Sequence, residues 1–191
     1  MITNAIFSRR SIRRYTDQTV SSTLIDQLLE AATCAPSSHN SQPWRFVVLR
    51  DPAVKANLAD EMGVRLRAER VQAMDRVAEI DRDVARSRER IAAAPVIIIA
   101  CLSTHNLHDA DERIMAQQSV AAAIENILLA AEEAGLGACW MAAPLYCPDV
   151  VRAVLRLPQD WDAQALITLG YPAGEGKRRE RVDFKQVTQY F

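Results

Sequence analysis

Basic residues that could bind a phosphate group form two clusters at opposite ends of the 191-residue chain. Arginine binds phosphate oxygens in a bidentate manner, and Ser11 adds a hydroxyl donor to the first cluster. The first cluster consists of Arg9, Arg10, Arg13 and Arg14, and the second of Lys177, Arg178, Arg179 and Arg181. Either cluster alone is typical of surface charge. The two clusters together with a polar, amide-rich segment predict a site for a phosphorylated cofactor.

That polar segment is APSSHNSQPW, at residues 35–44. The helical spacing of apolar residues such as Leu24 and Leu28 stops at Pro36, and mainly hydroxyl and amide side chains follow. The segment is too polar for a core and too rich in hydrogen-bonding groups to serve only as a turn. We therefore expect it to contact a ligand.

Motifs for catalysis by a side-chain nucleophile are missing from the sequence. GxSxG, a Walker loop and GxGxxG behind a strand are all absent, and no histidine lies in a recognisable triad setting. The loop at 105–113 has two histidines and three acidic residues, but their spacing matches no established metal-ligand pattern. We therefore expect no metal, and we expect a bound cofactor to supply the chemistry.

Composition and charge indicate one globular domain that spans residues 1–191. Hydrophobic residues make up 49% of the chain and charged residues 25%, and the formal net charge is −1. Such a balance gives no global attraction to nucleic acid or to a membrane, and the longest apolar run, at 92–102, is too short to span a bilayer. The four cysteines lack a CxxC pair, and no signal peptide is recognised. We expect a cytoplasmic protein with reduced thiols.

Apolar patterns predict four strands and several helices. The strands are expected at 44–51, 95–102, 135–141 and 164–172, and the last residues of the chain also read as strand-like. Helices are expected at 2–10, 22–34, 114–135 and 148–155. The helix is apolar on almost every face between Val120 and Ala131. Such a helix has to be covered all round, which indicates a subunit interface.

A charged helical insertion is expected at about 55–92. Residues 65–90 contain eight arginines and six acidic residues, with an apolar stripe of Val71, Met74, Val77 and Val84. One interpretation is a solvated helix that covers a neighbouring element, with its charges paired at i, i+4. The other interpretation is a lid whose arginines favour an acceptor that carries carboxylate or phosphate.

Four motifs give the chain a family resemblance: RRSIRRY, APSSHNSQPWRFVVL, GLGACWM and LITLGYP, in this order. Together they resemble the FMN-dependent nitroreductase family over nearly the whole chain. The resemblance implies an α+β fold, a nitroreductase-like sandwich with a mainly antiparallel central sheet flanked by helices. It also implies an intertwined homodimer with FMN at the subunit interface and a C-terminal tail that wraps onto the partner.

The resemblance assigns cofactor-binding positions to three parts of the chain. The phosphate-binding positions are Arg9, Arg10, Ser11 and Arg13, with Arg179 and Arg181 as the C-terminal basic pair. The positions that line the flavin from the opposite subunit are Pro36, Ser37, Ser38, Asn40 and Gln42. The stretch that runs past the ring is Trp140, Met141, Ala142 and Ala143. The resemblance implies no catalytic side chain and no metal.

The implied activity is ping-pong transfer of hydride from NADH or NADPH through FMN to a small oxidised acceptor, such as a nitroaromatic, a quinone or an enone. One alternative is a flavin-binding protein that is not an enzyme. The second half of the chain also resembles the flavin domain that is fused to the glutamyl ligase of deazaflavin coenzyme biosynthesis. A flavin reductase that acts on a deazaflavin intermediate is therefore a further alternative.

Overall fold

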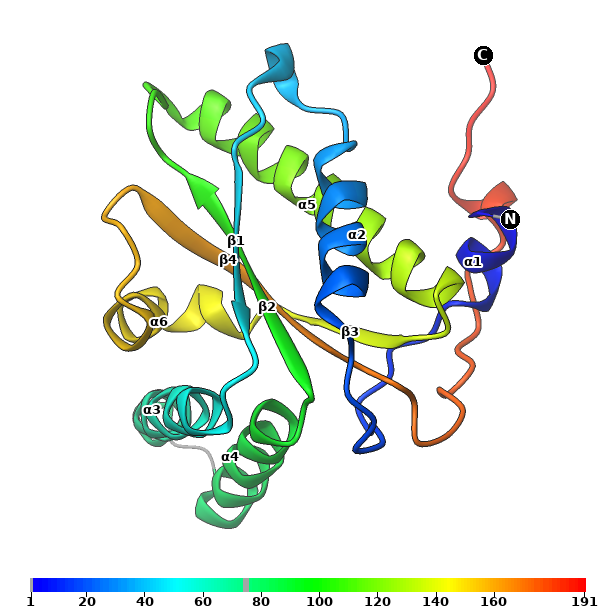
Figure 1. Cartoon of the computed structure of the whole chain (residues 1–191). Coiled ribbons are helices and arrows are strands. Elements are labelled where there is room, and N and C mark those ends of the chain that lie inside the picture. Colours follow the sequence, from blue (N-terminus) through cyan, green and yellow to red (C-terminus); the bar gives the residue numbers. More distant parts are fainter. Residues whose placement is uncertain (1, 74–75) are drawn as a thin grey trace.

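A four-stranded antiparallel sheet forms the centre of the protein (Figure 1). The structure is a computed structural model, and it describes residues 2–73 and 76–191. The strands are β1 (Trp44–Leu49), β2 (Val96–Ser103), β3 (Gly137–Met141) and β4 (Trp161–Gly170), in the order β1-β2-β4-β3. Each neighbouring pair is antiparallel. The expected antiparallel central sheet is therefore confirmed, with β1 and β3 as its edges.

Two helices cover one face of the sheet. They are α2 (Ser22–Thr33) and α5 (Ala110–Glu133), which pack through residues such as Leu28 and Ile127 onto Ile98 and Ile167. Side-chain caps begin both helices: Leu24 N–H donates to Ser21 Oγ (3.2 Å), and Glu112 N–H donates to Asp109 Oδ1 (2.8 Å). α2 and α5, each capped at its N-terminus, thus cover the first face of the sheet.

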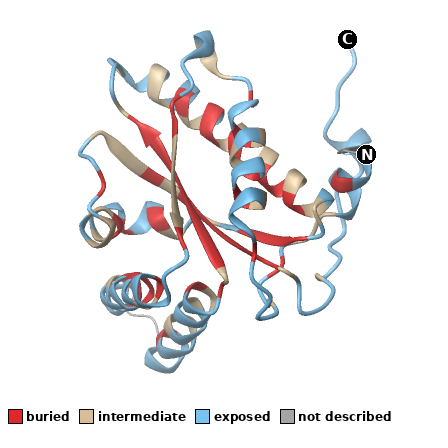
Figure 2. Cartoon of the chain, viewed as in Figure 1, coloured by how far each residue is buried: buried red, intermediate tan, exposed pale blue. Residues whose placement is uncertain are grey.

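Three helices cover the opposite face: α3 (Pro52–Gln72), α4 (Val77–Ala92) and α6 (Pro148–Leu155). Leu58 and Ile91 pack there against Ile97 and Ile99, which alternate along β2 with the residues that face α5. Because both faces are covered, β2 is buried along its whole length, as Figure 2 shows in red. The fold is therefore the sandwich, with helices on both sides of a central sheet, that the family resemblance implied.

The insertion is a pair of helices rather than one helix, and its apolar stripe was predicted wrongly. Val71 and Val77 are 52% and 59% exposed, Val84 is half-buried, and Met74 lies outside the described residues. Ile80 and Met62 are buried instead. The stripe was read along one continuous helix, whereas α3 and α4 fold back and pack on each other (Figure 1).

A buried lysine fastens this helix pair to the sheet. The Nζ atom of Lys55, in the first turn of α3, donates to Ala94 O (2.6 Å) and Pro95 O (3.1 Å). These carbonyls belong to the segment that joins α4 to β2. Burial lowers the pKa of Lys55, and the two hydrogen bonds offset part of the cost of burying its charge.

α5 meets the length and hydropathy of a membrane-spanning helix, and half of its apolar window is buried inside the protein. Val120, Ile124 and Leu128 face the core, whereas Ala121 and Leu129 on the other side are only half-buried. In a single chain this helix is therefore not covered all round.

The two ends of the chain lie side by side at the right of Figure 1. α1 (Ile2–Ser8) is followed by an extended segment, and the C-terminal tail contains only one short helical turn, η3 (Phe184–Gln186). The predicted strand-like end is wrong, because no strand follows Gly170. Residues 177–191 are all exposed, including Val187 and Tyr190, so a tail strand has no neighbour to pair with.

The segment after α1 is fastened to both β3 and β4. Ser11 forms a parallel bridge with Ala138, in which Ile12 N–H donates to Ala138 O (3.0 Å). Gly137 permits this close approach, because a Cβ atom at that position would lie 2.6 Å from Ile12 Cγ2. Tyr15 forms a second bridge, with Pro172.

We predict that Gly137→Ala destabilises the protein by about 1–3 kcal/mol, because the added methyl group overpacks against Ile12. Gly174→Ala is the matched control, since a Cβ atom there would meet nothing within 4 Å. Chemical denaturation of the two variants measures the difference. Equal stability of both variants and the wild type would contradict the close packing of the N-terminal segment on β3.

Candidate functional site

A basic pocket of about 530 Å³ lies where the two ends of the chain meet. Its walls are residues 9–14 and residues 173–177, 179 and 181. Seven of these side chains are basic, and Glu175 is the only acidic one among them. The predicted phosphate positions Arg9, Arg10, Ser11, Arg13, Arg179 and Arg181 therefore lie together in one pocket.

Tyr15 holds the first wall of the pocket in place. Its Oη lies 2.7 Å from Ile12 O, 2.7 Å from Thr168 Oγ1 and 3.0 Å from Thr168 O. Burial raises the pKa of Tyr15 far above its ordinary value, so the phenol stays protonated and can donate. The second wall approaches closely at Gly176, where a Cβ atom would collide with Arg10 Cβ.

The guanidinium groups in the pocket are mostly without carboxylate partners. Arg10 Nη1 donates to the carbonyls of Phe7 and Arg9 (both 2.8 Å), and Arg13 Nη1 donates to Ser11 O (3.3 Å). Arg9 Nε lies 3.7 Å from Glu125 Oε1. Among the described residues, Arg13, Arg14, Arg179 and Arg181 form no ion pair. Like charges held this close favour an anion with several oxygen atoms between them.

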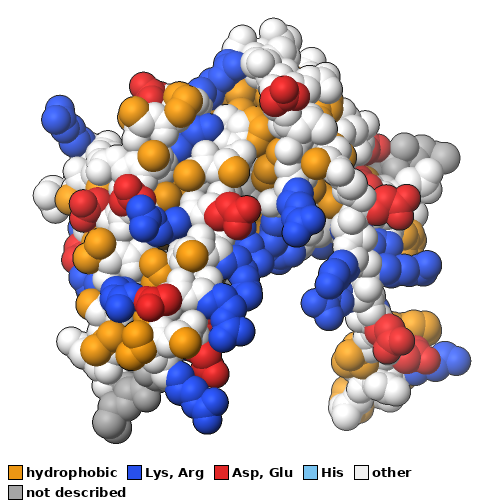
Figure 3. Space-filling model, turned by 90° about the horizontal axis from the view of Figure 1, so that it is seen from below, with side chains coloured by type: hydrophobic (Ala, Val, Ile, Leu, Met, Phe, Trp, Pro, Cys, Tyr) orange, Lys and Arg blue, Asp and Glu red, His pale blue; other side chains and the backbone are white. Residues whose placement is uncertain are grey.

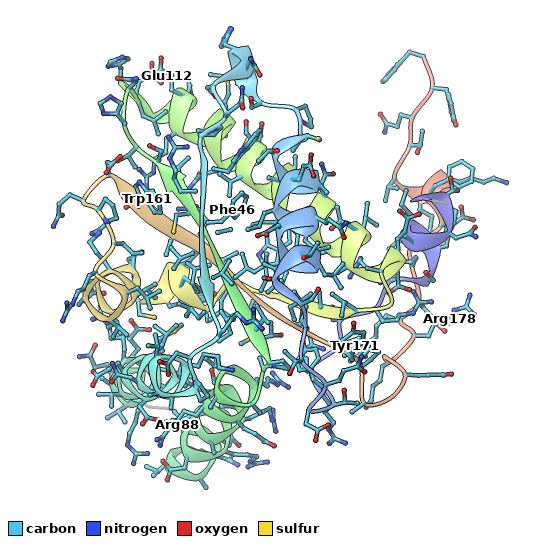
Figure 4. The ribbon with its side chains drawn as sticks, in the orientation of Figure 1. Phe46, Arg88, Glu112, Trp161, Tyr171 and Arg178 are labelled. Atoms are coloured by element: carbon cyan, nitrogen blue, oxygen red, sulfur yellow. The ribbon has the colours of Figure 1, made fainter. Side chains whose placement is uncertain are left out.

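A hollow separates the main body of the protein from its projecting C-terminal arm (Figure 3). Lys and Arg side chains gather along its walls in this view from below. Figure 4 places Arg178 on this arm, which is the exposed C-terminal tail at residues 177–191. Arg178 does not line the basic pocket but lines a second hollow of about 580 Å³, together with Glu132 and Leu136 at the end of α5.

The polar segment at 36–42 lies far from this pocket in the same chain. It forms the short helix η1 (Ser38–Asn40) and rests on the first half of α5, where Ser38 N–H donates to Ser119 Oγ (3.3 Å). Figure 1 shows it beyond the end of α2 that is opposite the pocket. One protomer therefore does not bring Pro36, Ser37, Ser38, Asn40 and Gln42 to the arginines.

The backbone of this segment is strained. His39, Asn40 and Gln42 have φ values of 51°, 54° and 46°, in the left-handed region, which Asn and His tolerate better than Gln, so the strain is greatest at Gln42. Local hydrogen bonds hold it: Gln42 N–H donates to Ser37 Oγ (3.1 Å), and Gln42 Nε2 donates to Asn40 Oδ1 (3.2 Å). Strained conformations of this kind concentrate at ligand sites.

The stretch from Trp140 to Ala143 lies at the end of β3, an edge strand of the sheet. Trp140 is 40% exposed, Met141 is half-buried, and both alanines remain partly or fully exposed. The exposed Leu145 and Tyr146 follow. This arrangement offers an apolar surface beside an open strand edge, which suits a planar ring with a polar rim.

Cys139 is the buried thiol nearest to the pocket charges. Burial raises its pKa, and the positive charges of Arg13, Arg90 and Arg9 lower the pKa in part. The thiol stays protonated at neutral pH and behaves as a small apolar side chain. No cluster of His, Cys, Asp or Glu suited to a metal occurs in residues 2–73 and 76–191. The expected loop at 105–113 is shorter in the structure, because α5 begins at Ala110, and the backbone N–H of His108 donates to Glu112 Oε2 in the first turn of that helix (2.7 Å).

Comparison with known proteins now adds to this geometry. The model of the nitroreductase family matches residues 6–171. The chain belongs to the nitroreductase family. One relative, from Thermus thermophilus, is named NADH dehydrogenase. It is 33% identical over an alignment of 194 residues in length, which covers 96% of this chain and 92% of the relative.

Solved structures of two other proteins share the whole fold. A nitroreductase-like protein of Desulfovibrio desulfuricans, solved in complex with FMN, is 29% identical with a TM-score of 0.76, and the match covers 100% of this chain and 97% of that one. A BluB-like flavoprotein of Clostridium difficile is 26% identical with a TM-score of 0.85, and the match covers 100% and 99% of the two chains.

The structure adds pocket residues that the family motifs did not assign. Arg14, Lys177 and the loop from Ala173 to Gly176 line the pocket together with the predicted arginines. The runs of basic residues in the sequence contained Arg14 and Lys177. The loop from Ala173 to Gly176 gave no comparable signal, because it has no basic side chain. It contributes through the close approach of its backbone at Gly176 to Arg10.

Proposed function

We propose that this oxidoreductase of the nitroreductase family passes hydride from NADH or NADPH through FMN to a small oxidised acceptor, such as a nitroaromatic, a quinone or an enone. The observation that carries the proposal is the pocket with seven basic side chains and one acidic side chain. The family match and the FMN-bound relative support the choice of FMN.

The residues of the pocket fit the two chemically different ends of FMN. Arg13, Arg179 and Arg181, which form no ion pair among the described residues, would hold the phosphate together with Arg9, whose Nε also lies 3.7 Å from Glu125 Oε1. The apolar surface of the exposed Trp140 and the half-buried Met141 would contact the ring, and the backbone of the 140–143 stretch would offer hydrogen bonds to its rim. When bound, FMN supplies the redox chemistry, the acceptance and release of hydride.

The side chains of this enzyme bind and orient, and none needs to act as an acid or a base. The arginines would hold the phosphate end and thereby orient the ring relative to β3. Donor and acceptor would use the same exposed face in turn, which gives ping-pong kinetics. Such a mechanism is consistent with a chain that has no nucleophile motif.

We also propose that the working form is a homodimer whose two sites are each shared between the subunits. The 36–42 segment lies far from the pocket of its own chain, so a second copy would supply it. Exposed apolar side chains support an interface: Ile6 and Phe7 on α1, Phe184, Val187 and Tyr190 on the tail, and the half-buried side of α5.

The acceptor and the cellular setting belong to the same proposal. We propose that residues 1–191 form one domain with a helical insertion at 55–92. We also propose that this domain works in the cytoplasm, because NADH and NADPH are available there and thiols stay reduced. The likeness of the second half to the flavin domain of the deazaflavin pathway makes a deazaflavin intermediate one acceptor to test. A flavin binder without turnover is the remaining alternative.

The visible spectrum tests the function directly. Purified protein is expected to show a flavin band at about 450 nm that bleaches rapidly when NADH or NADPH is added without oxygen, and that returns when an acceptor is added. Bound flavin that neither donor reduces would identify a flavin-binding protein that is not an enzyme. Protein that takes up no FMN at all would overturn the proposal.

Neighbouring arginines test the phosphate position. Arg179→Ala and Arg9→Ala are expected to weaken FMN binding by about 1.5–3 kcal/mol each, the value of a charged hydrogen bond. Arg178→Ala is the control, because this side chain lines the other hollow. Fluorescence titration of apoprotein with FMN measures the affinities. The assignment fails if Arg178→Ala weakens binding as much as Arg179→Ala does.

Light scattering at low micromolar concentration is expected to give twice 21.3 kDa for the FMN-loaded protein.

Mixed dimers test more sharply whether each site is shared between the two subunits. Arg179→Ala and Asn40→Ala would damage different halves of each site, so a mixed dimer of the two variants retains one intact site and binds FMN there with wild-type affinity. A stable FMN-loaded monomer would contradict the dimer.

A further inference from the structure

The polar segment at 36–42 is fastened to α5 by two hydrogen bonds of Ser38. The backbone N–H of Ser38 donates to Ser119 Oγ (3.3 Å), and its Oγ donates to Met115 Sδ (3.4 Å). Both partners lie in the first half of α5, beside which Figure 1 shows the segment. α5 is therefore the surface on which the first turn of the segment rests.

Ser119 is a polar residue in an apolar part of α5. It is only 5% exposed, and its neighbours Val120 and Ala123 are buried. Its Oγ donates to Met115 O on the preceding turn (2.8 Å), which leaves the lone pairs of the oxygen for the N–H of Ser38. Alanine would favour the helix more than serine does at such a position. The contact with the segment therefore accounts for the hydroxyl group, whereas the helix does not need it.

The bond to Ser119 comes directly before the strained part of the segment. Ser38 begins the short helix η1, and left-handed backbone conformations follow at 39, 40 and 42. Such conformations persist only where the surrounding structure holds them. Arg45 Nη1 holds the far end by donating to Gln42 O (3.2 Å). Without the acceptor on Ser119, the half-buried N–H of Ser38 would lack a partner, and the start of the turn would relax.

We propose that Ser119 is a positioning residue for the flavin site, because it holds the 36–42 segment in the conformation in which Asn40 contacts the FMN of the other subunit. The proposal rests on the proposed function, in which the two subunits share each site. Ser119 touches no cofactor and acts only through the backbone of Ser38. Its removal therefore damages the half of the site that the segment supplies and leaves the arginines of its own pocket in place.

Fluorescence titration of apoprotein with FMN tests the proposal. Ser119→Ala is expected to weaken FMN binding about fivefold to tenfold, the effect of losing one hydrogen bond. Ser119→Thr keeps the hydroxyl group and is expected to bind FMN more tightly than Ser119→Ala. Ser103→Ala is the matched control, because Ser103 is also 5% exposed and its hydroxyl donates to Asp160 Oδ2 (3.5 Å). Wild-type affinity in Ser119→Ala, or an equal loss in Ser103→Ala, would overturn the inference.

Mixed dimers separate a positioning role from a general loss of stability. A mixed dimer of Ser119→Ala with Arg179→Ala is expected to keep one site of wild-type affinity, because the two changes damage different halves of each site. A mixed dimer of Ser119→Ala with Asn40→Ala is expected to keep no such site, because both changes damage the same half. The inference fails if the first mixed dimer also lacks an intact site.

Amide hydrogen exchange of the apoprotein tests the mechanism without the cofactor. Ser119→Ala is expected to speed the exchange of the Ser38 N–H about tenfold, because the turn opens locally, while exchange in the core strand β2 stays within twofold. An unchanged exchange rate at Ser38 would refute the positioning role even if FMN binding became weaker.

Asn40→Ala by itself separates failure of this inference from failure of the proposed function. If Asn40→Ala weakens FMN binding and Ser119→Ala does not, the inference is overturned and the shared site stands. If Asn40→Ala binds FMN as the wild type does, the shared site of the proposed function is refuted, and the inference fails with it.

Discussion

The hydrogen bonds that fasten residues 11–15 to β3 and β4 determine where positive charge collects on this protein. The bridge to Ala138 fixes Ser11 and Ile12, and the Tyr15 phenol fixes the other end of the segment through Thr168. Arg13 and Arg14 lie between these two points and are held beside the loop that follows β4. Without this anchoring, repulsion between the arginines would disperse them into solvent.

The basic side chains of this protein differ in whether they form ion pairs with carboxylates. The net charge of the chain is only −1, yet the pocket holds seven basic side chains and one acidic one. The insertion has eight arginines in residues 65–90, but six of them form ion pairs, three of these with an acidic residue on the facing helix. Solvent-exposed pairs of this kind add little stability.

The edges of the sheet and the ends of the chain point to a second subunit. β3 is an edge strand that only the short bridge from Ser11 partly covers, and the strained 36–42 segment is exposed at the other end of the molecule. The tail carries large apolar side chains with no cover in its own chain. Each of these features is costly in a monomer, and one dimer interface would account for all three.

Local patterns in the sequence determined the elements and the family. Continuous apolar runs predicted β2 and β4, helical spacing predicted α2 and α5, and the motifs at 9–15, 35–49, 135–141 and 166–172 gave the family that the comparisons confirm. The two basic clusters were visible in the sequence, because residue type alone gives charge and donor geometry.

Only the tertiary structure decided which of those charges remain available. The sequence suggested pairs along one helix, whereas Arg67, Arg70 and Arg88 pair across the α3–α4 contact, whose register depends on how two helices pack. The apolar stripe at Val71 and Val77 failed for the same reason. The strand-like tail failed because a strand needs a partner, and partners are set by the fold.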